Sequence, residues 1–162
     1  MMADNTKPIL DPCCGSRMFY FDKEDPRVLF CDNREVEETL CDGRTLKVRP
    51  DLVADFRDLP FGNESFDLVI FDPPHLRKAG EASWLAKKYG TLPRKGWEDY
   101  LRQGLSECWR VLRPGGTLVF KWNEEQILLS RILPLLPDKP VMGTPRGKTI
   151  FLVLYKPKKD ME

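Results

Sequence analysis

Residues 58–75 read DLPFGNESFDLVIFDPPH, and this stretch holds the clearest strand boundary in the chain. The run DLVIF at 67–71 has the β-branched and aromatic side chains of a strand that is buried on both faces. Pro73 and Pro74 cannot continue such a strand, because proline lacks the backbone N–H that pairs one strand with the next. We therefore predict a buried strand that ends in a turn at Asp72.

Five other short runs have the same character, and Gly, Pro or Asp bounds them. They are KPIL at 7–10, RVLF at 27–30, DLVA at 51–54, TLVFKW at 117–122 and TIFLVLY at 149–155. Nearly continuous apolar runs of this kind suit the strands of a parallel sheet that helices cover.

Helical patterns lie between these runs. One apolar stripe recurs at intervals of three or four residues, and RPGG at 113–116 follows it as a stop signal. Its members are Trp97, Leu101, Leu105, Trp109 and Leu112. The segment 123–133 begins with a capping residue and two acids, and Pro134 ends it. The alternation of strands and helices predicts the α/β class with a mostly parallel sheet.

Two segments depart from this alternation. Gly15 and Pro26 are so close together that any helix between them must be short. Asp42-Gly43 stands between two short extended runs, as the turn of a β-hairpin does. We expect a hairpin there in place of a helix.

Length and composition set the outer bounds. A chain of 162 residues predicts one domain over 1–162, and 41% hydrophobic and 31% charged residues are ordinary for a globular protein. No apolar run approaches the roughly 20 residues that a membrane span needs. The N-terminal MMADNTKP lacks the basic and apolar regions of a signal peptide, so we expect a cytoplasmic protein with no membrane partner.

The cysteines and the lone histidine limit the kinds of site. The five cysteines are an odd count without a C-x-x-C pair, and His75 is the one histidine. This set argues against a disulfide framework and against a zinc site, so we predict no metal. A cysteine nucleophile would need His75 as its base, and that alternative stays open.

Basic charge is segregated along the chain, although the net charge is only +1. Segment 76–96 has six basic residues and one acid, and segment 139–159 has six basic residues and no acid. Such asymmetry suggests an anionic partner that faces these segments. Lys and Arg also solvate loops and tails without any partner, so charge alone does not decide.

Four of the predicted strands end in an aspartate, namely Asp11, Asp32, Asp55 and Asp72. Ligands of open α/β sheets bind at the carboxyl ends of strands, so these side chains are candidates for a common site. Each aspartate alone also has a plainer explanation, because Asp is common in turns through hydrogen bonds to the backbone.

The order of these acids points to one kind of ligand. Asp11 opens a turn whose Gly15 allows close backbone approach, and a carboxylate there suits a cationic amino group. Asp32 follows 21 residues later, near the spacing at which an acid accepts hydrogen bonds from ribose hydroxyls. Asp55 would accept from the exocyclic amine of an adenine, and Phe56 would present its backbone N–H to the ring. Together they describe an adenosine that carries an amino acid.

Four segments resemble the successive motifs of class I S-adenosylmethionine-dependent methyltransferases: ILDPCCGS, LFCDN, ADFRDLPFGNESFDLVIFDPP and ECWRVLRPGGTLVFKW. They keep the order of the family and cover about residues 8–122. The resemblance implies a Rossmann-like, seven-stranded, mostly parallel sheet with an antiparallel last strand and helices on both faces. It implies S-adenosyl-L-methionine as the cofactor and S-adenosyl-L-homocysteine as its product. The implied cofactor-binding residues are Asp11, Pro12, Cys13, Cys14, Gly15 and Ser16 for the methionine part, Asp32 and Asn33 for the ribose, Asp55 and Phe56 for the adenine, and Asp72.

The turn DPPH at 72–75 is similar to the Asp/Asn-Pro-Pro-aromatic motif of methyltransferases that modify amino nitrogens, chiefly adenine N6 in nucleic acids. An exocyclic amine is a poor nucleophile, because its lone pair is delocalised into the ring, so catalysis needs acceptors for both N–H bonds. Asp72 and the Pro73 carbonyl would be these acceptors, and Pro73 with Pro74 would fix the backbone. His75 would stack on the base instead of acting as a general base or a metal ligand.

The expected substrate is a nucleic acid, either DNA or RNA. The chain has no room for a separate target-recognition domain, so recognition would come from segment 76–96 or from a partner subunit. The candidate substrate-binding residues are His75, Arg77, Lys78, Lys87, Lys88 and Tyr89. Arg17 stands where such methyltransferases usually have glycine, which would narrow the methionine pocket or bring a cation near the carboxylate.

Two further functions stay open at this point. One is a small-molecule or protein methyltransferase on the same fold, because a fold does not set the substrate. The other is a cofactor-binding accessory subunit without catalysis. The sequence does not distinguish DNA from RNA, and it does not set the oligomeric state.

Overall fold

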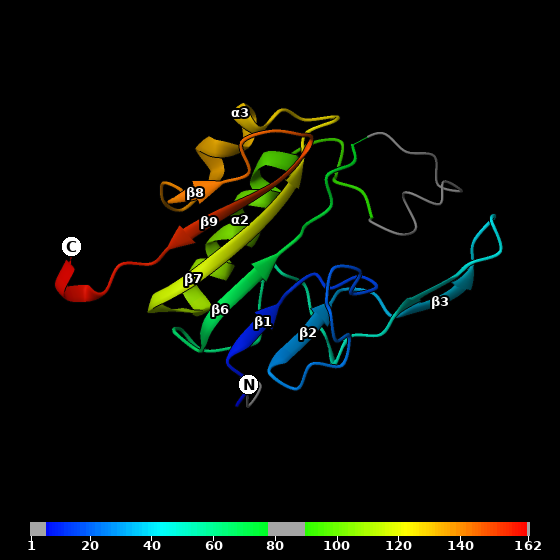
Figure 1. Ribbon diagram of the computed structural model, residues 1–162, viewed down its shortest axis with the longest axis horizontal. Helices are drawn as coiled ribbons and strands as arrows, with labels where there is room; N and C mark the ends of the chain where they lie inside the picture. Colours follow the sequence, from blue (N-terminus) through cyan, green and yellow to red (C-terminus); the bar gives the residue numbers. More distant parts are fainter. Residues whose placement is uncertain (1–5, 78–89, 162) are drawn as a thin grey trace.

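The computed structural model describes residues 6–77 and 90–161 of the chain (Figure 1). Within these residues, seven strands form one sheet: β1 (Ile9–Asp11), β2 (Val28–Asp32), β5 (Leu52–Val53), β6 (Phe66–Phe71), β7 (Leu112–Asn123), β8 (Met142–Gly143) and β9 (Thr149–Tyr155). Their order across the sheet is β5-β2-β1-β6-β7-β9-β8. The strands from β5 to β7 pair in parallel, whereas β9 pairs antiparallel with both β7 and β8. This confirms the predicted Rossmann-like sheet with an antiparallel last strand.

The strand order creates a switch point between β1 and β6. From β1 the chain builds outward through β2 to β5, and it then returns to place β6 on the other side of β1. In open α/β sheets, ligands bind at such a point, outside the carboxyl ends of the strands. Asp11 and Asp32 close β1 and β2, and Asp72 follows β6 directly. The topology thus brings the ends of these three strands to one edge of the sheet.

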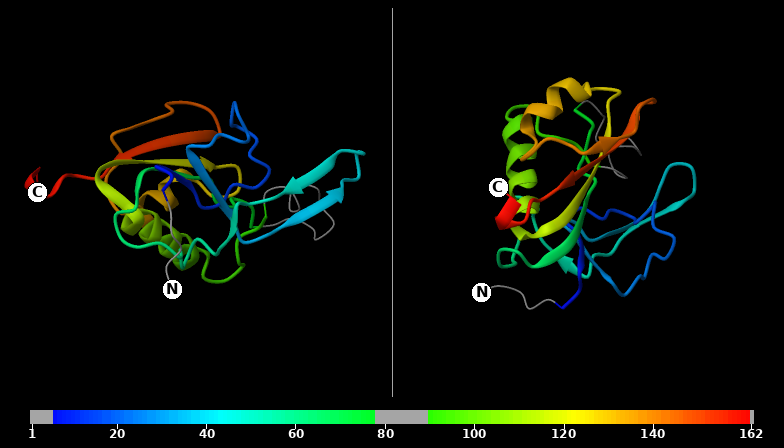
Figure 2. Two further views of the ribbon diagram at one scale, coloured as in Figure 1. Left: turned by 90° about the horizontal axis from the view of Figure 1, so that it is seen from below. Right: turned by 60° about the vertical axis from the view of Figure 1, so that its left-hand side comes forward.

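The α-helices of residues 6–77 and 90–161 lie on one face of the sheet (Figure 2). They are α2 (Trp97–Val111) and α3 (Leu129–Ile132), and the 3-10 helix η1 (Leu133–Leu135) continues α3. α2 buries Leu101, Leu105 and Cys108 in one core with Phe71 and Phe120 of the sheet. The predicted apolar stripe is therefore the face that α2 buries, although Leu112 already belongs to β7. No helix in the described ranges is both long and apolar enough to cross a membrane.

Segment 12–27 covers part of the opposite face and contains no helix. Within the described residues, this segment takes the place of a helix on that face of the sheet. Gly15 and Arg17 have φ angles of 51° and 59°, whereas an α-helix needs successive residues near −60°. The chain thus turns twice after β1, and the residues that remain before Pro26 form no helix.

Aromatic side chains attach this segment to the sheet. The Phe19 ring lies 6.4 Å from that of Phe151 on β9, and Tyr20 packs edge-on at 4.8 Å from Phe30 on β2. Phe21 next to them is fully exposed. Segment 12–27 is therefore held by side-chain packing, which fixes its position beside the switch point.

A β-hairpin of β3 (Val36–Thr39) and β4 (Thr45–Val48) follows β2 and projects from the body of the molecule (Figure 1). Its turn contains Gly43 at φ 86°, a conformation that glycine adopts without strain. The structure thus confirms the hairpin predicted from Asp42-Gly43.

The predicted helix over 123–133 is wrong in its first half. Asn123 is the last residue of β7, and α3 begins only at Leu129. The backbone N–H of Glu124 still donates to the Lys148 carbonyl beyond the strand, 2.9 Å away. The Glu124 carboxylate accepts from the backbone N–H of Leu129 at 3.0 Å, so this acid holds the start of α3 and does not lie in its first turn.

Arg110 on α2 fixes the stretch that leads into β6. Its guanidinium donates to the carbonyls of Leu59 and Phe61, at 3.1 and 2.8 Å. Glu107, one turn earlier on α2, accepts from the backbone N–H of Leu59 at 2.8 Å. The loop has no strand or helix partner for these backbone groups, so the side chains of Arg110 and Glu107 supply their hydrogen bonds.

Candidate functional site

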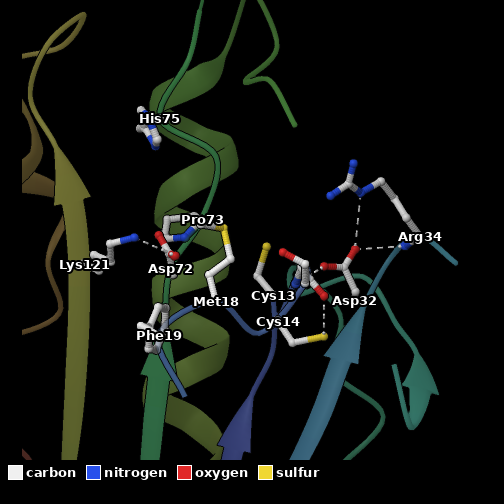
Figure 3. A pocket seen from close by; sticks show the side chains of 12 residues that line it. Cys13, Cys14, Met18, Phe19, Asp32, Arg34, Asp72, Pro73, His75 and Lys121 are labelled. Atoms are coloured by element: carbon white, nitrogen blue, oxygen red, sulfur yellow. Dashed lines mark hydrogen bonds and ion pairs between the residues drawn. The ribbon is translucent and has the colours of Figure 1, made fainter. Parts of the chain in front are cut away.

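A cavity of about 220 Å³ lies at the switch point (Figure 3). Its wall combines the turn after β1, the end of β2, the turn after β6, one residue of β7 and part of segment 12–27. The lining residues are Cys13, Cys14, Gly15, Ser16, Met18, Phe19, Asp32, Arg34, Asp72, Pro73, His75 and Lys121. Six of the predicted cofactor-binding residues meet here with two of the predicted catalytic turn residues besides Asp72.

Asp32 joins the end of β2 to the turn after β1. Its carboxylate accepts from the backbone N–H of Gly15 at 2.9 Å and from that of Arg34 at 3.0 Å. The Arg34 guanidinium lies 3.6 Å from the same carboxylate, so a cation balances this buried charge. Asp32 is 2% exposed, and it is still one of the groups that line the cavity.

Asp11 is fully buried and does not line the cavity. It accepts a hydrogen bond from the Tyr20 hydroxyl at 2.8 Å and another from the backbone N–H of Cys13 at 3.0 Å. Burial raises the pKa of Asp11 to about 7, against the opposing effect of these two hydrogen bonds. The negative charges of Asp72 and Asp32 raise it further. Asp11 thus holds the turn after β1 through hydrogen bonds without itself lining the cavity.

The two cysteines of the turn are protonated thiols. Burial raises the pKa of Cys13 and of Cys14 above the usual range, and the nearby Asp11 and Asp32 act in the same direction. A cysteine nucleophile reacts as the thiolate, so this environment disfavours the nucleophile alternative. The thiols serve here as small neutral wall groups.

Asp72 pairs with a residue that the sequence analysis did not single out. Lys121 on β7 donates from Nζ to Asp72 Oδ2 at 3.1 Å, and each side chain is 22% exposed. Burial raises the pKa of Asp72, and the Lys121 ammonium opposes that rise. The register places Phe71 opposite Phe120, so the residues that follow them, Asp72 and Lys121, also lie side by side. The two residues are 49 positions apart in the sequence, so only the strand pairing shows that Lys121 belongs to the site.

His75 lines the cavity next to the same cation. Its ring meets the Trp122 ring edge-on at a centroid distance of 6.3 Å. Burial lowers the pKa of His75, the Lys121 charge lowers it further, and Glu125 acts against both. A lowered pKa means a neutral imidazole at pH 7, which suits a stacking surface.

The predicted adenine-binding residues lie outside the cavity wall. The Asp55 carboxylate forms a forked ion pair with Arg57 at 2.7 Å, and this pair lowers the pKa of Asp55. The Phe56 side chain is buried in the core, where its ring packs 5.0 Å from both Phe71 and Tyr100. Gly104 on α2 makes room for that ring, since a Cβ there would lie 2.7 Å from it.

Three other predicted residues also stand apart from the cavity wall. Pro12 and Pro74 are buried, and Asn33 is exposed, so that its neighbour Arg34 takes the place in the wall. Arg77 lies beyond the DPPH turn, where its backbone N–H donates to Gln126 Oε1 at 2.6 Å. Four further candidates, Lys78, Lys87, Lys88 and Tyr89, lie outside the described residues.

Arg17 points away from the cavity. Its guanidinium donates to the carbonyls of Lys23 and Arg49 at 2.5 and 2.7 Å, and it lies 3.9 Å from the centre of the Phe30 ring. Arg17 is therefore not one of the residues that line the cavity, although its neighbours Ser16 and Met18 are. It ties segment 12–27 to Arg49, the residue that follows β4 of the hairpin.

The site residues that sequence reasoning missed are Met18, Phe19, Arg34 and Lys121. The first two come from segment 12–27, which folds back over the sheet because it forms no helix. Among the described residues, no three His, Cys, Asp or Glu side chains lie where they could hold a metal ion together.

No protein-family model matches the chain, and no curated protein does either. Solved structures share its fold. One is an S-adenosylmethionine-dependent methyltransferase from Methanosarcina mazei, 12% identical, with 92% of each chain covered and a TM-score of 0.56. Another is a chain from the Haloferax volcanii complex between the methyltransferase activator Trm112 and a methyltransferase. It is 16% identical over 93% of this chain and 82% of that one, with a TM-score of 0.52.

A third is the 16S rRNA N2 methyltransferase RsmC of T. thermophilus, solved with AdoMet and guanosine. It is 16% identical over 98% of this chain and 37% of that one, with a TM-score of 0.53. Identities this low establish a common fold. The chain therefore has the Rossmann-like fold of the S-adenosylmethionine-dependent methyltransferases.

Proposed function

We propose that this protein is an S-adenosylmethionine-dependent methyltransferase whose acceptor is an amino nitrogen of a nucleic-acid base, in DNA or RNA. One observation carries the proposal. The Asp72-Pro73-Pro74-His75 turn lies against a cavity whose other walls are Asp32 and the turn from Cys13 to Ser16. A carboxylate for an amine and a carboxylate for a ribose thus open into the same space.

The residues of the cavity fit this cofactor. Within the described residues, the Asp32 carboxylate accepts from two backbone N–H groups and lies near the Arg34 guanidinium. A carboxylate has about four acceptor positions, so it would still have room for a ribose hydroxyl. The turn from Cys13 to Ser16, shaped from behind by Asp11 and Pro12, would surround the methionine part. Asp55 would exchange Arg57 for the adenine amine, with the Phe56 backbone N–H on the ring and Asn33 near the ribose.

The bound cofactor would supply a methyl group on a positively charged sulfur. The chain would do the rest by holding the amine in line with that group, which needs fixed acceptors and the exclusion of water. Asp72 and the Pro73 carbonyl would accept the two N–H bonds, and Pro74 would stiffen the turn. His75 would stack on the base.

Exposed basic residues support an anionic substrate. Lys139, Arg146 and Lys158 are exposed in segment 139–159, and Arg94 and Lys95 are exposed in segment 76–96. Such residues grip phosphates without reading sequence, and binding through them weakens steeply as salt rises. Target recognition would come from segment 76–96, including Arg77, Lys78, Lys87, Lys88 and Tyr89, or from a partner subunit. We also propose that residues 1–162 act as one cytoplasmic domain.

The test measures transfer of a labelled methyl group from S-adenosylmethionine to single-stranded and double-stranded DNA and RNA. We expect label on at least one of them, and Asp72→Ala should abolish transfer while cofactor affinity in calorimetry stays within about threefold. Asp138→Asn, at an exposed aspartate far along the chain, is the matched control and should leave both unchanged.

The alternatives give different results. A small-molecule or protein methyltransferase would bind the cofactor, leave every nucleic acid unlabelled and show little salt dependence. An accessory subunit would bind the cofactor and label nothing in any mixture without its partner. Absence of cofactor binding would contradict all three functions.

A further inference from the structure

Lys121 reaches the cavity from β7, whereas the predicted residues reach it from the turns after β1 and β6 and from the end of β2. Its neighbours along β7, Phe120 and Trp122, are buried in the core beneath α2. Side chains alternate along a strand, so Lys121 faces the cavity side of the sheet. Figure 3 shows its ammonium directed at Asp72.

The ammonium lies near one carboxylate and one aromatic ring. Lys121 Nζ lies 3.1 Å from Asp72 Oδ2 and 5.3 Å from the centre of the Phe19 ring. Exposed ion pairs contribute little, because water screens them and the side chains lose freedom. This pair is mostly sheltered, so removing one partner leaves the other in a poorly solvated place.

Burial makes the ionisation of Asp72 harder, because it raises the pKa of the carboxyl. The negative charge of Asp72 in turn raises the pKa of Asp11 on β1, of the Tyr20 hydroxyl and of the Cys13 thiol, and so favours their protonated forms. His75 on its own turn is neutral at pH 7. Lys121 is therefore the group that offsets the burial of Asp72.

Methyl transfer to an amine would move positive charge to a nitrogen next to the Asp72 carboxylate. The N–C bond forms as the S–C bond breaks, so the positive charge passes from sulfur to nitrogen, and the nitrogen then loses a proton. An ionised carboxylate stabilises that charge and can take the proton on to solvent, whereas a protonated one is a poor acceptor. Within the described ranges Oδ1 of Asp72 accepts no hydrogen bond, so Lys121 on Oδ2 leaves that oxygen for the substrate.

We infer that Lys121 is a positioning residue: it holds the Asp72 carboxylate charged, with Oδ1 turned toward the amine that is to be methylated. This inference rests on the proposed function for its role in turnover. The effect on Asp72 itself is measurable without any turnover.

The first experiment titrates the side-chain carboxyl of Asp72 by ¹³C NMR in aspartate-labelled protein, with the signal assigned from Asp72→Asn. In Lys121→Met the midpoint should rise by about one unit or more, because an opposite charge within about 4–6 Å lowers a carboxyl pKa by one to three units. Lys121→Arg should stay near the wild-type value. Lys148→Met, which removes an exposed lysine paired with Glu125, is the control and should change nothing.

An equal midpoint in wild type and Lys121→Met would overturn the inference. Lys121→Gln repeats the measurement if the methionine variant does not fold, and an unchanged midpoint there has the same meaning. A raised midpoint supports the inference whether or not the protein methylates the substrates tried.

The second experiment follows activity against pH. In Lys121→Met the acid limb of kcat should move to higher pH by the same amount as the NMR midpoint, so that the loss at pH 7 recovers in alkaline buffer. A purely structural role would lower activity at every pH. If wild type shows no transfer while the NMR midpoint still shifts, the proposed function fails and the placement of Lys121 stands. If wild type is active and the midpoint is unchanged, the function stands and this inference fails.

Discussion

Tyr20 donates a hydrogen bond from its hydroxyl to Asp11 Oδ2, with the two oxygens 2.8 Å apart. This contact joins the helix-free segment 12–27 to the end of β1, at the base of the cavity wall. Together with the backbone N–H of Cys13, the Tyr20 hydroxyl supplies the hydrogen bonds that offset the burial of the Asp11 carboxylate. Segment 12–27 thus owes its position to a polar contact as well as to aromatic packing.

Removal of the hydroxyl in Tyr20→Phe should lower the free energy of unfolding. A hydrogen bond to an ionised group contributes about 1–3 kcal/mol, and Asp11 is ionised to a growing extent above pH 7. The loss should therefore be larger at pH 8.5 than at pH 5. Urea unfolding at the two pH values measures it. Tyr155→Phe is the control, because within the described residues its hydroxyl makes no such contact, and equal losses in both variants would contradict the assignment.

Asp11 should make stability fall as pH rises. Its pKa in the folded protein is about 7, above the ordinary value of 3.8 for an aspartic acid, so only the folded state keeps the proton between these values. Stability from this group is complete below about pH 4, is lost progressively up to about pH 7 and stays constant above. Asp11→Asn cannot titrate, so the difference between wild type and variant isolates the effect. Urea unfolding from pH 4 to 8 measures it, and parallel curves for the two proteins would refute it.

Gly104→Ala should destabilise the protein although alanine favours helices. A Cβ at this position would lie 2.7 Å from the Phe56 ring and 3.0 Å from that of Phe71, inside the core under α2. Overpacking of this kind costs about 1–3 kcal/mol, which exceeds the roughly 1 kcal/mol that alanine gains over glycine in a helix. Thermal unfolding measures the difference. Ser106→Ala, on the exposed side of the same helix, should leave the melting temperature unchanged or raise it.

Much of the sheet could be predicted, because its strands are short apolar runs bounded by residues that break them. The DLVIF run became β6 with one residue added at its start. Periodicity alone did not indicate the antiparallel direction of the last strand, which followed from the resemblance, and the order of the strands comes from the structure. The start of α3 could not be read from 123–133. Asn123 followed by two acids is typical of a helix start, but the pairing of β7 with β9 keeps Asn123 in a strand.

The site divides in the same way. Asp32, Asp72 and the turn from Cys13 to Ser16 could be named in advance because they follow strands, and strand ends meet at a switch point. Lys121 lies in the middle of an apolar run, and only the register between β6 and β7 sets it beside Asp72. Phe19 reaches the cavity because segment 12–27 folds back, which no local pattern foretells.

His75 provides the sharpest test of how the proposed site treats its substrate. It lines the cavity, and burial together with Lys121 lowers the pKa of its ring, so a neutral aromatic face is offered at pH 7. If that face stacks on a base, His75→Phe should keep kcat within about threefold, whereas His75→Ala should raise KM by about tenfold, because stacking contributes about 1–3 kcal/mol per base. Steady-state kinetics on one nucleic-acid substrate measure both variants. Loss of kcat in a His75→Phe protein that folds and binds cofactor normally would assign proton transfer to the imidazole, since phenylalanine can stack but cannot carry a proton.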